Sequence, residues 1–93
     1  MVFDNVTRYN GSGLELYISA DYDGVSNPSQ QGTWIDLTSY ATWDTDSGDW
    51  TFISSGNIDL TTFISPSLAI AFKYTGSNSD GATWELDNII VTE

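Results

Sequence analysis

Apolar and polar side chains alternate along much of the chain, and two segments show this pattern most clearly. Residues 14–20 place one set of apolar side chains on a single face, namely Leu14, Leu16, Ile18 and Ala20. Residues 68–75 repeat the pattern with Leu68, Ile70, Phe72 and Tyr74. A period of two is that of a β-strand with one buried face. Both segments are therefore predicted to be half-buried strands.

Three more strands are predicted between turn-rich segments, at residues 2–9, 33–39 and 50–54. In the second of these, Ile35 and Leu37 share the face that is expected to point inward. Residues 58–63 form a short element with room for one helical turn. Residues 10–13, Asn-Gly-Ser-Gly, are turn residues that tolerate positive φ. The first two strands are therefore expected to form a hairpin.

The last predicted strand, residues 83–92, changes its phase midway. Trp84 and Leu86 share one face, whereas Ile89 and Val91 lie on the opposite phase. A β-bulge at residues 87–88 would turn both apolar pairs inward and direct the carboxylate of Asp87 to a rim of the sheet. The remaining strands are expected to pack around this segment.

About five or six strands without helical periodicity predict an all-β chain that folds as an antiparallel β-sandwich; the jelly-roll type of this sandwich is implied only by the family resemblance described below. The 93 residues are enough for a single module spanning residues 1–93. An apolar fraction of 40% and an aromatic fraction of 14% favour a folded globule over a disordered chain. No segment has the apolar length that crosses a bilayer, so membrane insertion is not expected.

Charge is the strongest compositional signal, because 13 acids face only Arg8 and Lys73 and give a net charge of −11. Such a surface repels phosphate backbones, which argues against nucleic-acid binding. It attracts divalent cations, although an acidic surface can also serve solubility alone.

The absence of His and Cys removes most catalytic machinery. No Ser-His or Cys-His pair and no imidazole or thiolate metal ligand can form. A carboxylate pair such as Glu85 and Asp87 could serve glycoside hydrolysis, but that chemistry also needs a deep cleft. We therefore expect no enzymatic activity.

Calcium is the better use for the acids, since it takes six to eight oxygen ligands gathered from loops. Three acidic clusters qualify: Asp21 with Asp23; Asp44, Asp46 and Asp49; and Asp80 with Glu85 and Asp87. The middle cluster resembles the start of an EF-hand loop but lacks its terminal Glu. Any one such cluster, taken alone, is more often a solvated loop than a metal site. The metal ligands predicted are Asp87, Glu85, Asp80, Asp21 and Asp23.

Aromatic side chains suggest a second kind of chemistry, because a sugar ring stacks on an exposed indole or phenol ring. The candidates are Trp34, Trp43, Trp50, Tyr17, Tyr22 and Tyr40. In a small sandwich a Trp commonly fills the core, and Trp84 and Trp50 are assigned there. Trp43, among acids and turn residues, is expected to be exposed. The predicted ligand-binding residues are Trp43, Tyr22 and Trp34.

The end of the chain resembles a known family. A strand of the form W-x-[LI]-D-[ND]-[IV], here residues 84–89, follows an [IV]-A-F-[KR]-Y strand, here residues 70–74. Together with LELYISADYDG and GTWIDLT, these motifs resemble the C-terminal part of the β-jelly-roll modules of choice-of-anchor J and cleaved-adhesin type. Such modules occur in secreted proteins of Bacteroidetes and are similar in build to MAM domains.

The resemblance implies a secreted or cell-surface accessory module for adhesion or carbohydrate binding, with a structural calcium that Asp87 ligates. A jelly roll has about eight strands, more than expected here, so the chain is predicted to be a piece of a larger secreted protein. The alternative is a structural spacer or sorting-associated domain with no ligand of its own. The partners expected are a glycan or cell-surface polymer and, through unpaired sheet edges, a second copy in a homodimer.

Overall fold

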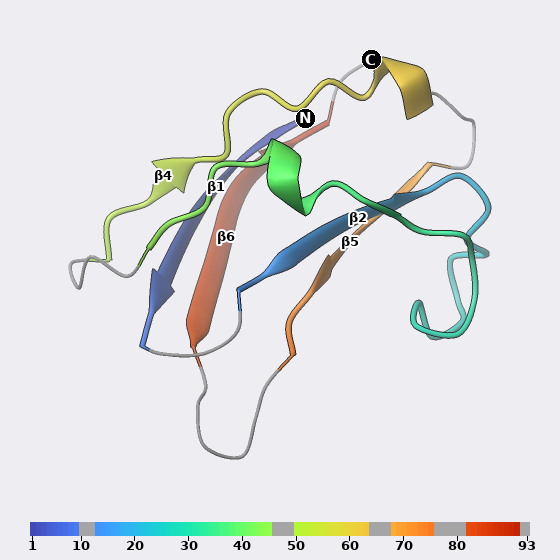
Figure 1. Ribbon diagram of the computed structural model, residues 1–93, viewed down its shortest axis with the longest axis horizontal. Helices are drawn as coiled ribbons and strands as arrows, with labels where there is room; N and C mark the ends of the chain where they lie inside the picture. Colours follow the sequence, from blue (N-terminus) through green and yellow to red (C-terminus); the bar gives the residue numbers. More distant parts are fainter. Residues whose placement is uncertain (10–12, 46–49, 64–67, 76–81, 92–93) are drawn as a thin grey trace.

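The computed structural model describes residues 1–9, 13–45, 50–63, 68–75 and 82–91 (Figure 1). Six strands in this part of the chain form two three-stranded sheets, and all four strand pairings are antiparallel. The described ranges contain no α-helix and only two short 3₁₀ turns, η1 (Thr38–Tyr40) and η2 (Thr61–Phe63). The predicted all-β class and antiparallel β-sandwich are confirmed.

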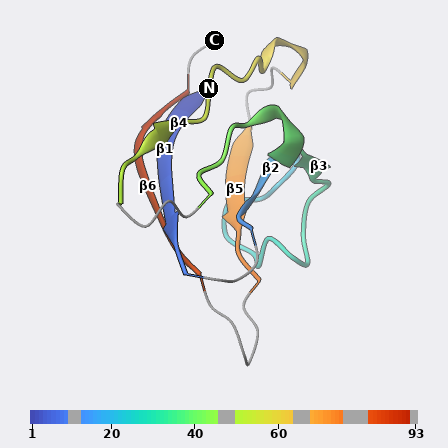
Figure 2. The ribbon, with the colours of Figure 1, turned by 60° about the vertical axis from the view of Figure 1, so that its left-hand side comes forward.

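The first sheet has the order β4-β1-β6, with the longest strands in its centre and at one edge. Its members are β4 (Ile53–Ser54), β1 (Val2–Arg8) and β6 (Thr83–Ile90). The second sheet has the order β3-β2-β5. It consists of β3 (Ile35–Asp36), β2 (Glu15–Ser19) and β5 (Ala69–Lys73). Figure 2 shows the two sheets as separate layers.

The predicted hairpin between the first two strands is wrong, because β1 and β2 belong to different sheets. Each strand carries an apolar face. Phe3 of β1 and both Leu16 and Ile18 of β2 are at most 1% exposed. The strands bury these side chains by packing face to face across the sandwich, which gains more apolar contact than edge-to-edge pairing would.

The core lies between the sheets and is tied together by a series of aromatic rings. Phe3 is fully buried and packs 5.2 Å from the ring of Phe72 and 5.4 Å from that of Trp43. Trp43 in turn meets the edge of Trp84 at 5.8 Å. These four rings come from β1, β5, β6 and the segment after η1, so they join both layers. The buried apolar side chains around them are Met1, Leu16, Ile18, Leu37, Ile58 and Leu60.

Two predicted tryptophan placements are wrong. Trp43 was expected to be exposed, yet it packs against the core cluster and donates its indole N–H to the Thr38 carbonyl at 2.9 Å. Trp50 was expected in the core, yet it is 41% exposed. After η1 the chain runs to the end of β4, where the Thr42 N–H donates to the Ser55 carbonyl. The polar residues next to Trp43 in sequence do not reveal this path.

The predicted bulge in the last strand is confirmed. Val2 lies opposite Ile90 and Asp4 lies opposite Asp87, so β6 has one more residue than β1 across this interval. Asn88 absorbs the extra residue with a φ of 51°, a left-handed conformation that Asn tolerates. The predicted inward turn of Ile89 and Val91 is wrong, since they are 49% and 47% exposed.

The third predicted strand is shorter than expected. Only Ile35–Asp36 pairs with β2, and the chain then turns into η1, where Leu37 is 2% exposed but Ile35 is 46% exposed. The Asp36 carboxylate accepts the Thr38 N–H at 2.8 Å, which favours the turn over a longer strand. The shared inward face predicted for Ile35 and Leu37 is therefore lost.

A buried amide joins three segments at the polar end of the core. Asn5 is fully buried, and its Nδ2 donates to the carbonyls of Thr42 and Ile53 at 3.1 and 3.4 Å. Its Oδ1 accepts the Asp44 N–H at 2.8 Å, and the Asp44 carboxylate accepts the Thr7 N–H at 2.9 Å. These bonds hold the segment after η1 against β1.

We predict that Asn5→Ala lowers the free energy of unfolding by about 3 kcal/mol, because the three backbone partners of the amide lose a bond inside the core. Chemical denaturation measures the change. Asn57→Ala, at an exposed loop position, is the matched control and should change stability by less than about 0.5 kcal/mol. Equal losses in the two variants would contradict the role of the buried amide.

Candidate functional site

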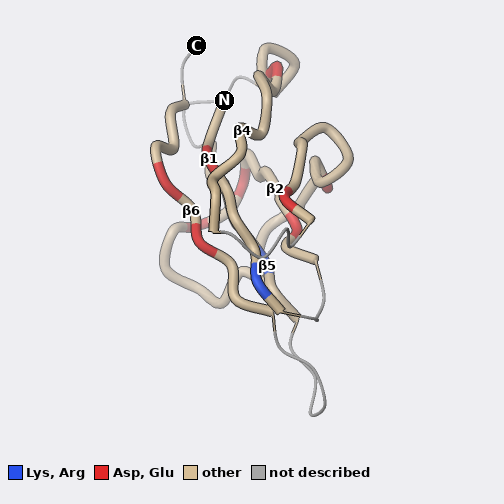
Figure 3. Tube along the Cα trace, turned by 90° about the vertical axis from the view of Figure 1, so that its left-hand side faces the viewer, with Lys and Arg blue, Asp and Glu red and all other residues tan. Residues whose placement is uncertain are grey.

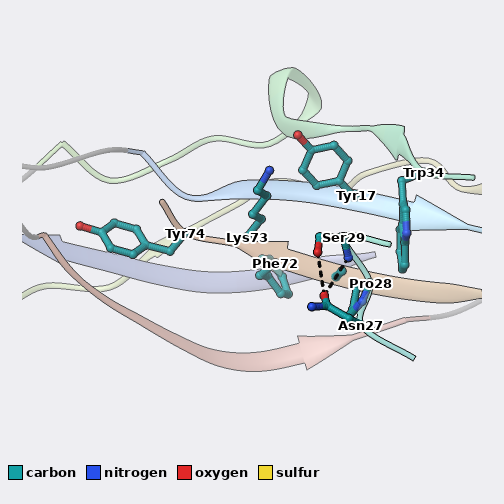
Figure 4. A pocket seen from close by; sticks show the side chains of 9 residues that line it. Tyr17, Asn27, Pro28, Ser29, Trp34, Phe72, Lys73 and Tyr74 are labelled. Carbon is teal, nitrogen blue, oxygen red and sulfur yellow. Dashed lines mark hydrogen bonds between the residues drawn. The ribbon is translucent and has the colours of Figure 1, made fainter. Parts of the chain in front are cut away.

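A groove of about 430 Å³ lies along β2 and β5 of the second sheet, beside the loop that precedes β3 (Figure 4). This volume falls in the range of small-molecule sites. Figure 4 shows Tyr74 at one end of the groove, Trp34 at the other, and Tyr17 with Lys73 between them. The remaining lining residues are Asn27, Pro28, Ser29, Ala71 and Phe72.

The floor of the groove comes from the pairing of β2 with β5. Tyr17 lies opposite Ala71, and Glu15 lies opposite Lys73. Because alternate residues of a strand share a face, Tyr17 and Lys73 are presented together on the outer face while Leu16 and Phe72 pair on the inner side. The small side chain of Ala71 leaves the space between the aromatic groups open.

The phenol of Tyr17 is fixed by a carboxylate. Its O–H donates to Oε2 of Glu15 at 2.5 Å. This hydrogen bond, together with desolvation and the negative charges of Glu15 and Asp36, raises the pKa of Tyr17 to about 12. Tyr17 therefore stays a neutral ring with a defined orientation at physiological pH.

The loop of residues 20–34 forms one wall of the groove, and two carboxylates fold it. Asp21 accepts hydrogen bonds from the Ser19 hydroxyl at 2.8 Å and from the Thr33 N–H at 2.6 Å. Asp23 accepts the N–H groups of Val25 and Ser26 at 2.9 and 2.8 Å. These bonds favour the ionised carboxylates, so the pKa values of Asp21 and Asp23 are lowered.

The end of this loop sets the position of Trp34. Its indole N–H donates to the Gln31 carbonyl at 2.9 Å, and its ring packs 5.2 Å from that of Tyr22. Gly32 has a φ of 92°, and a Cβ there would lie 3.2 Å from Nε1 of Trp34. A glycine is therefore required for the close approach that holds the indole at the groove.

The far end of the groove carries a cation and a third ring. Lys73 is exposed, and the described residues include no partner that forms an ion pair with it. Tyr74 is 37% exposed, and its phenol oxygen accepts the Ala82 N–H at 2.8 Å. The groove thus combines three ring faces with an ammonium donor and the polar side chains of Asn27 and Ser29.

Residues 2–93 match the family model DUF5017, described as a domain of unknown function. The chain belongs to the DUF5017 family. No curated protein and no solved structure matches it. In the described part of this DUF5017 chain, no helix is long and apolar enough to cross a membrane.

The predicted ligand-binding residues of the DUF5017 domain have three different positions. Trp34 lines the groove and Tyr22 packs against the ring of Trp34. Trp43 packs against the core. Lys73 and Tyr74 were missed because the alternation of residues 68–75 marks them only as parts of a strand. The register between β2 and β5, which alternation does not specify, puts Lys73 on the same face as Tyr17, and Tyr74 directly follows the end of β5.

The predicted metal ligands do not gather into one cluster among the described residues, where no three acidic side chains lie together. Asp21 and Asp23 use their oxygens to fold the loop. Asp80 lies outside the described residues, as do Asp46 and Asp49 of the middle cluster. Figure 3 shows that the acids are spread over strands and loops of both sheets.

The remaining predicted ligands, Glu85 and Asp87, are exposed on β6. Asp87 lies opposite Asp4, and Nδ2 of Asn88 donates to Oδ2 of Asp4 at 2.9 Å. Like charges opposite each other on neighbouring strands repel. Two carboxylates supply only part of the oxygen shell that calcium requires, so the described residues alone do not form a complete calcium site.

We predict that Tyr17 ionises at a pH of about 12 and that Glu15→Gln lowers its pKa toward the ordinary value of 10.0. Because the folded-state pKa is raised, the stabilisation from the Tyr17–Glu15 bond is fully present below pH 10 and is lost as pH rises through about 12. Phenolate absorbance measures the titration, and Tyr17→Phe identifies the signal of this ring. Asp59→Asn should leave it unchanged, and ionisation of Tyr17 near pH 10 in the parent chain would contradict the prediction.

Proposed function

We propose that this DUF5017 domain is a non-catalytic module that binds carbohydrate in the groove on its second sheet. The observation that supports this most is the convergence of Tyr17, Trp34 and Tyr74 with Lys73 around one open depression. Rings that are held in place and flanked by a few polar groups are typical of sites that bind amphipathic ligands.

The proposed mode of binding follows from the groups present. The C–H face of a pyranose ring stacks on the indole of Trp34 and on the phenol rings, while Lys73, Asn27 and Ser29 offer hydrogen bonds to its hydroxyls. Because Tyr17 and Trp34 are already fixed by Glu15 and the Gln31 carbonyl, little side-chain entropy is lost on binding. The net charge of −11 favours a neutral polysaccharide over an acidic one.

Binding is favoured over catalysis because the described residues that line the groove include no carboxylate. Glycoside hydrolysis uses two carboxyl groups that flank the scissile bond. Glu85 and Asp87, the pair considered from the sequence, lie on β6 of the other sheet.

The biological setting of the proposal rests on the resemblance to choice-of-anchor J and cleaved-adhesin modules. From this resemblance we infer that the domain belongs to a secreted or cell-surface protein, in which binding of a glycan in the groove would serve adhesion. The other function considered is a structural spacer or sorting-associated domain, which would give no selective signal on a glycan array.

We predict that Trp34→Ala weakens binding to a soluble neutral polysaccharide by at least about tenfold, since loss of a central aromatic anchor costs about 2 kcal/mol. Xylan, mannan and soluble starch are the probes, and isothermal titration calorimetry measures the affinity. Lys73→Ala, at an exposed position that no fold contact requires, should weaken the same interaction.

The matched control is Tyr40→Ala, because Tyr40 is 69% exposed and does not line the groove. Its affinity should equal that of the parent chain. Unchanged binding in both Trp34→Ala and Lys73→Ala would refute the groove as the site. If the parent chain bound none of the three polysaccharides, the structural spacer would be the favoured function.

Calcium stabilisation is the second part of the proposal and rests on the repelling pair Asp4 and Asp87. A ligand that binds only the folded state raises the free energy of unfolding by about 2.7 kcal/mol at a hundredfold excess over its dissociation constant. We predict a higher melting temperature in calcium than in chelator, a difference that Asp87→Asn abolishes and Asp59→Asn retains. Equal melting temperatures for the metal-stripped parent chain would exclude a structural ion.

A further inference from the structure

Two exposed aromatic rings meet at the end of β1, on the sheet opposite to the groove. Tyr9 directly follows β1, and Trp50 precedes β4 by a short extended segment. Their side chains are 58% and 41% exposed, and the ring centroids lie 6.4 Å apart with the planes at 76°. We refer to Tyr9 and Trp50 together as the aromatic corner.

Both residues of the aromatic corner have an unfavourable backbone. The φ angles of Tyr9 and Trp50 are 74° and 59°, in the left-handed region. Among the described residues, the other non-glycine position with positive φ is Asn88, and Asn tolerates this conformation whereas bulky aromatic residues do not. The chain thus has backbone strain at two positions whose rings stay about half exposed, which points to a role outside folding.

A cation orders one of the two rings. The guanidinium carbon of Arg8 lies 5.4 Å from the ring centroid of Tyr9, a cation–π geometry. The edge-to-face contact with Trp50 limits the ring from a second side. The corner is therefore a preorganised arrangement of two ring planes set nearly at right angles.

We propose that the aromatic corner is a second carbohydrate-stacking site, independent of the groove, that takes a neutral polysaccharide chain. A sugar ring can stack its C–H face on one aromatic plane and direct its hydroxyls to the polar edge of the other, where the phenol O–H or indole N–H lies.

The size of the corner argues for a sugar over a protein partner. A stable protein interface buries about 800 Å² on each side, far more than two half-exposed side chains offer. A single pyranose matches the area of one or two aromatic rings. The net charge of −11 again disfavours an acidic polymer.

The position of the corner gives the domain two binding faces. The groove lies on the sheet β3-β2-β5, and the corner flanks the sheet β4-β1-β6. One domain can then hold two polysaccharide chains or two points on the same chain. A multivalent polymer would be retained more strongly than either site alone explains.

Glycine substitutions test the corner without a loss of fold. Glycine adopts positive φ freely, so Tyr9→Gly and Trp50→Gly remove the strain together with the ring. We expect both variants to melt at the same temperature as the parent chain or higher. In native gels containing xylan, mannan or soluble starch, both should show at least a tenfold weaker retention by the polysaccharide that retains the parent chain. Tyr40→Ala is the control for an exposed aromatic side chain.

The outcomes separate the corner from the groove. If the glycine variants lose retention by the polysaccharide and Trp34→Ala shows a separate loss of retention, the result supports two independent sites. Loss in Trp34→Ala alone overturns the corner and leaves the groove. Lower melting temperatures in both glycine variants show that the rings serve folding, which also overturns the proposal. Absence of parent-chain retention on every polysaccharide overturns both sites.

Discussion

The contact of Phe3 with its aromatic neighbours is the constraint on which the rest of the structure depends. Phe3 lies near the start of β1 and is fully buried against Phe72 of the opposite sheet and Trp43 of the connecting segment. Burial of such a side chain contributes about 1.5 to 3 kcal/mol. In a small domain with a total stability of about 5 to 15 kcal/mol, that burial is a substantial fraction of what holds the two sheets together.

The core that results has two different ends, and the difference explains how the outer surfaces are built. The side chains packed around Phe3 are apolar. Further along β1 the core contains the polar residues Asn5 and Asp44, and the Asp44 N–H donates to Oδ1 of Asn5. Polar groups with fixed partners specify one arrangement of the segments they join. The connecting segment is thereby held on β1, and β2 is left with a free outer face for Tyr17 and the groove.

Local alternation predicted the longer strands because it reports which face of a segment is buried, whereas the predicted strands 33–39 and 50–54 pair only over Ile35–Asp36 and Ile53–Ser54. Residues 14–20 and 68–75 were recognised in this way, and the change of phase near Asp87 revealed the bulge. Alternation does not say whether two strands meet edge to edge or face to face, which is why the hairpin was wrong. The same gap hid the groove, since only the register of β5 on β2 presents Lys73 on the same face as Tyr17.

The tryptophans show a second reason for failure. Trp43 and Trp50 have similar polar neighbours in sequence, yet one fills the core and the other is exposed. Their ring contacts include those with Phe3 of β1 and with Tyr9, which directly follows β1, and both lie more than thirty residues away along the chain. The residues next to a tryptophan in sequence carry no information about such distant partners. The sequence therefore predicted that the candidate site would be aromatic, but it did not predict which aromatic residues would form it.

The register of β1 on β6 has a mechanical consequence. Val2 and Ile90 lie side by side, so the two ends of the domain leave from the same end of one antiparallel pair (Figure 1). Tension transmitted through both ends would separate these strands from that end and break their hydrogen bonds one after another, as a zipper opens. Strands pulled from opposite ends would instead resist with all their bonds at once. The domain would therefore yield at low force and lengthen, strand by strand, from the end where β1 begins and β6 ends.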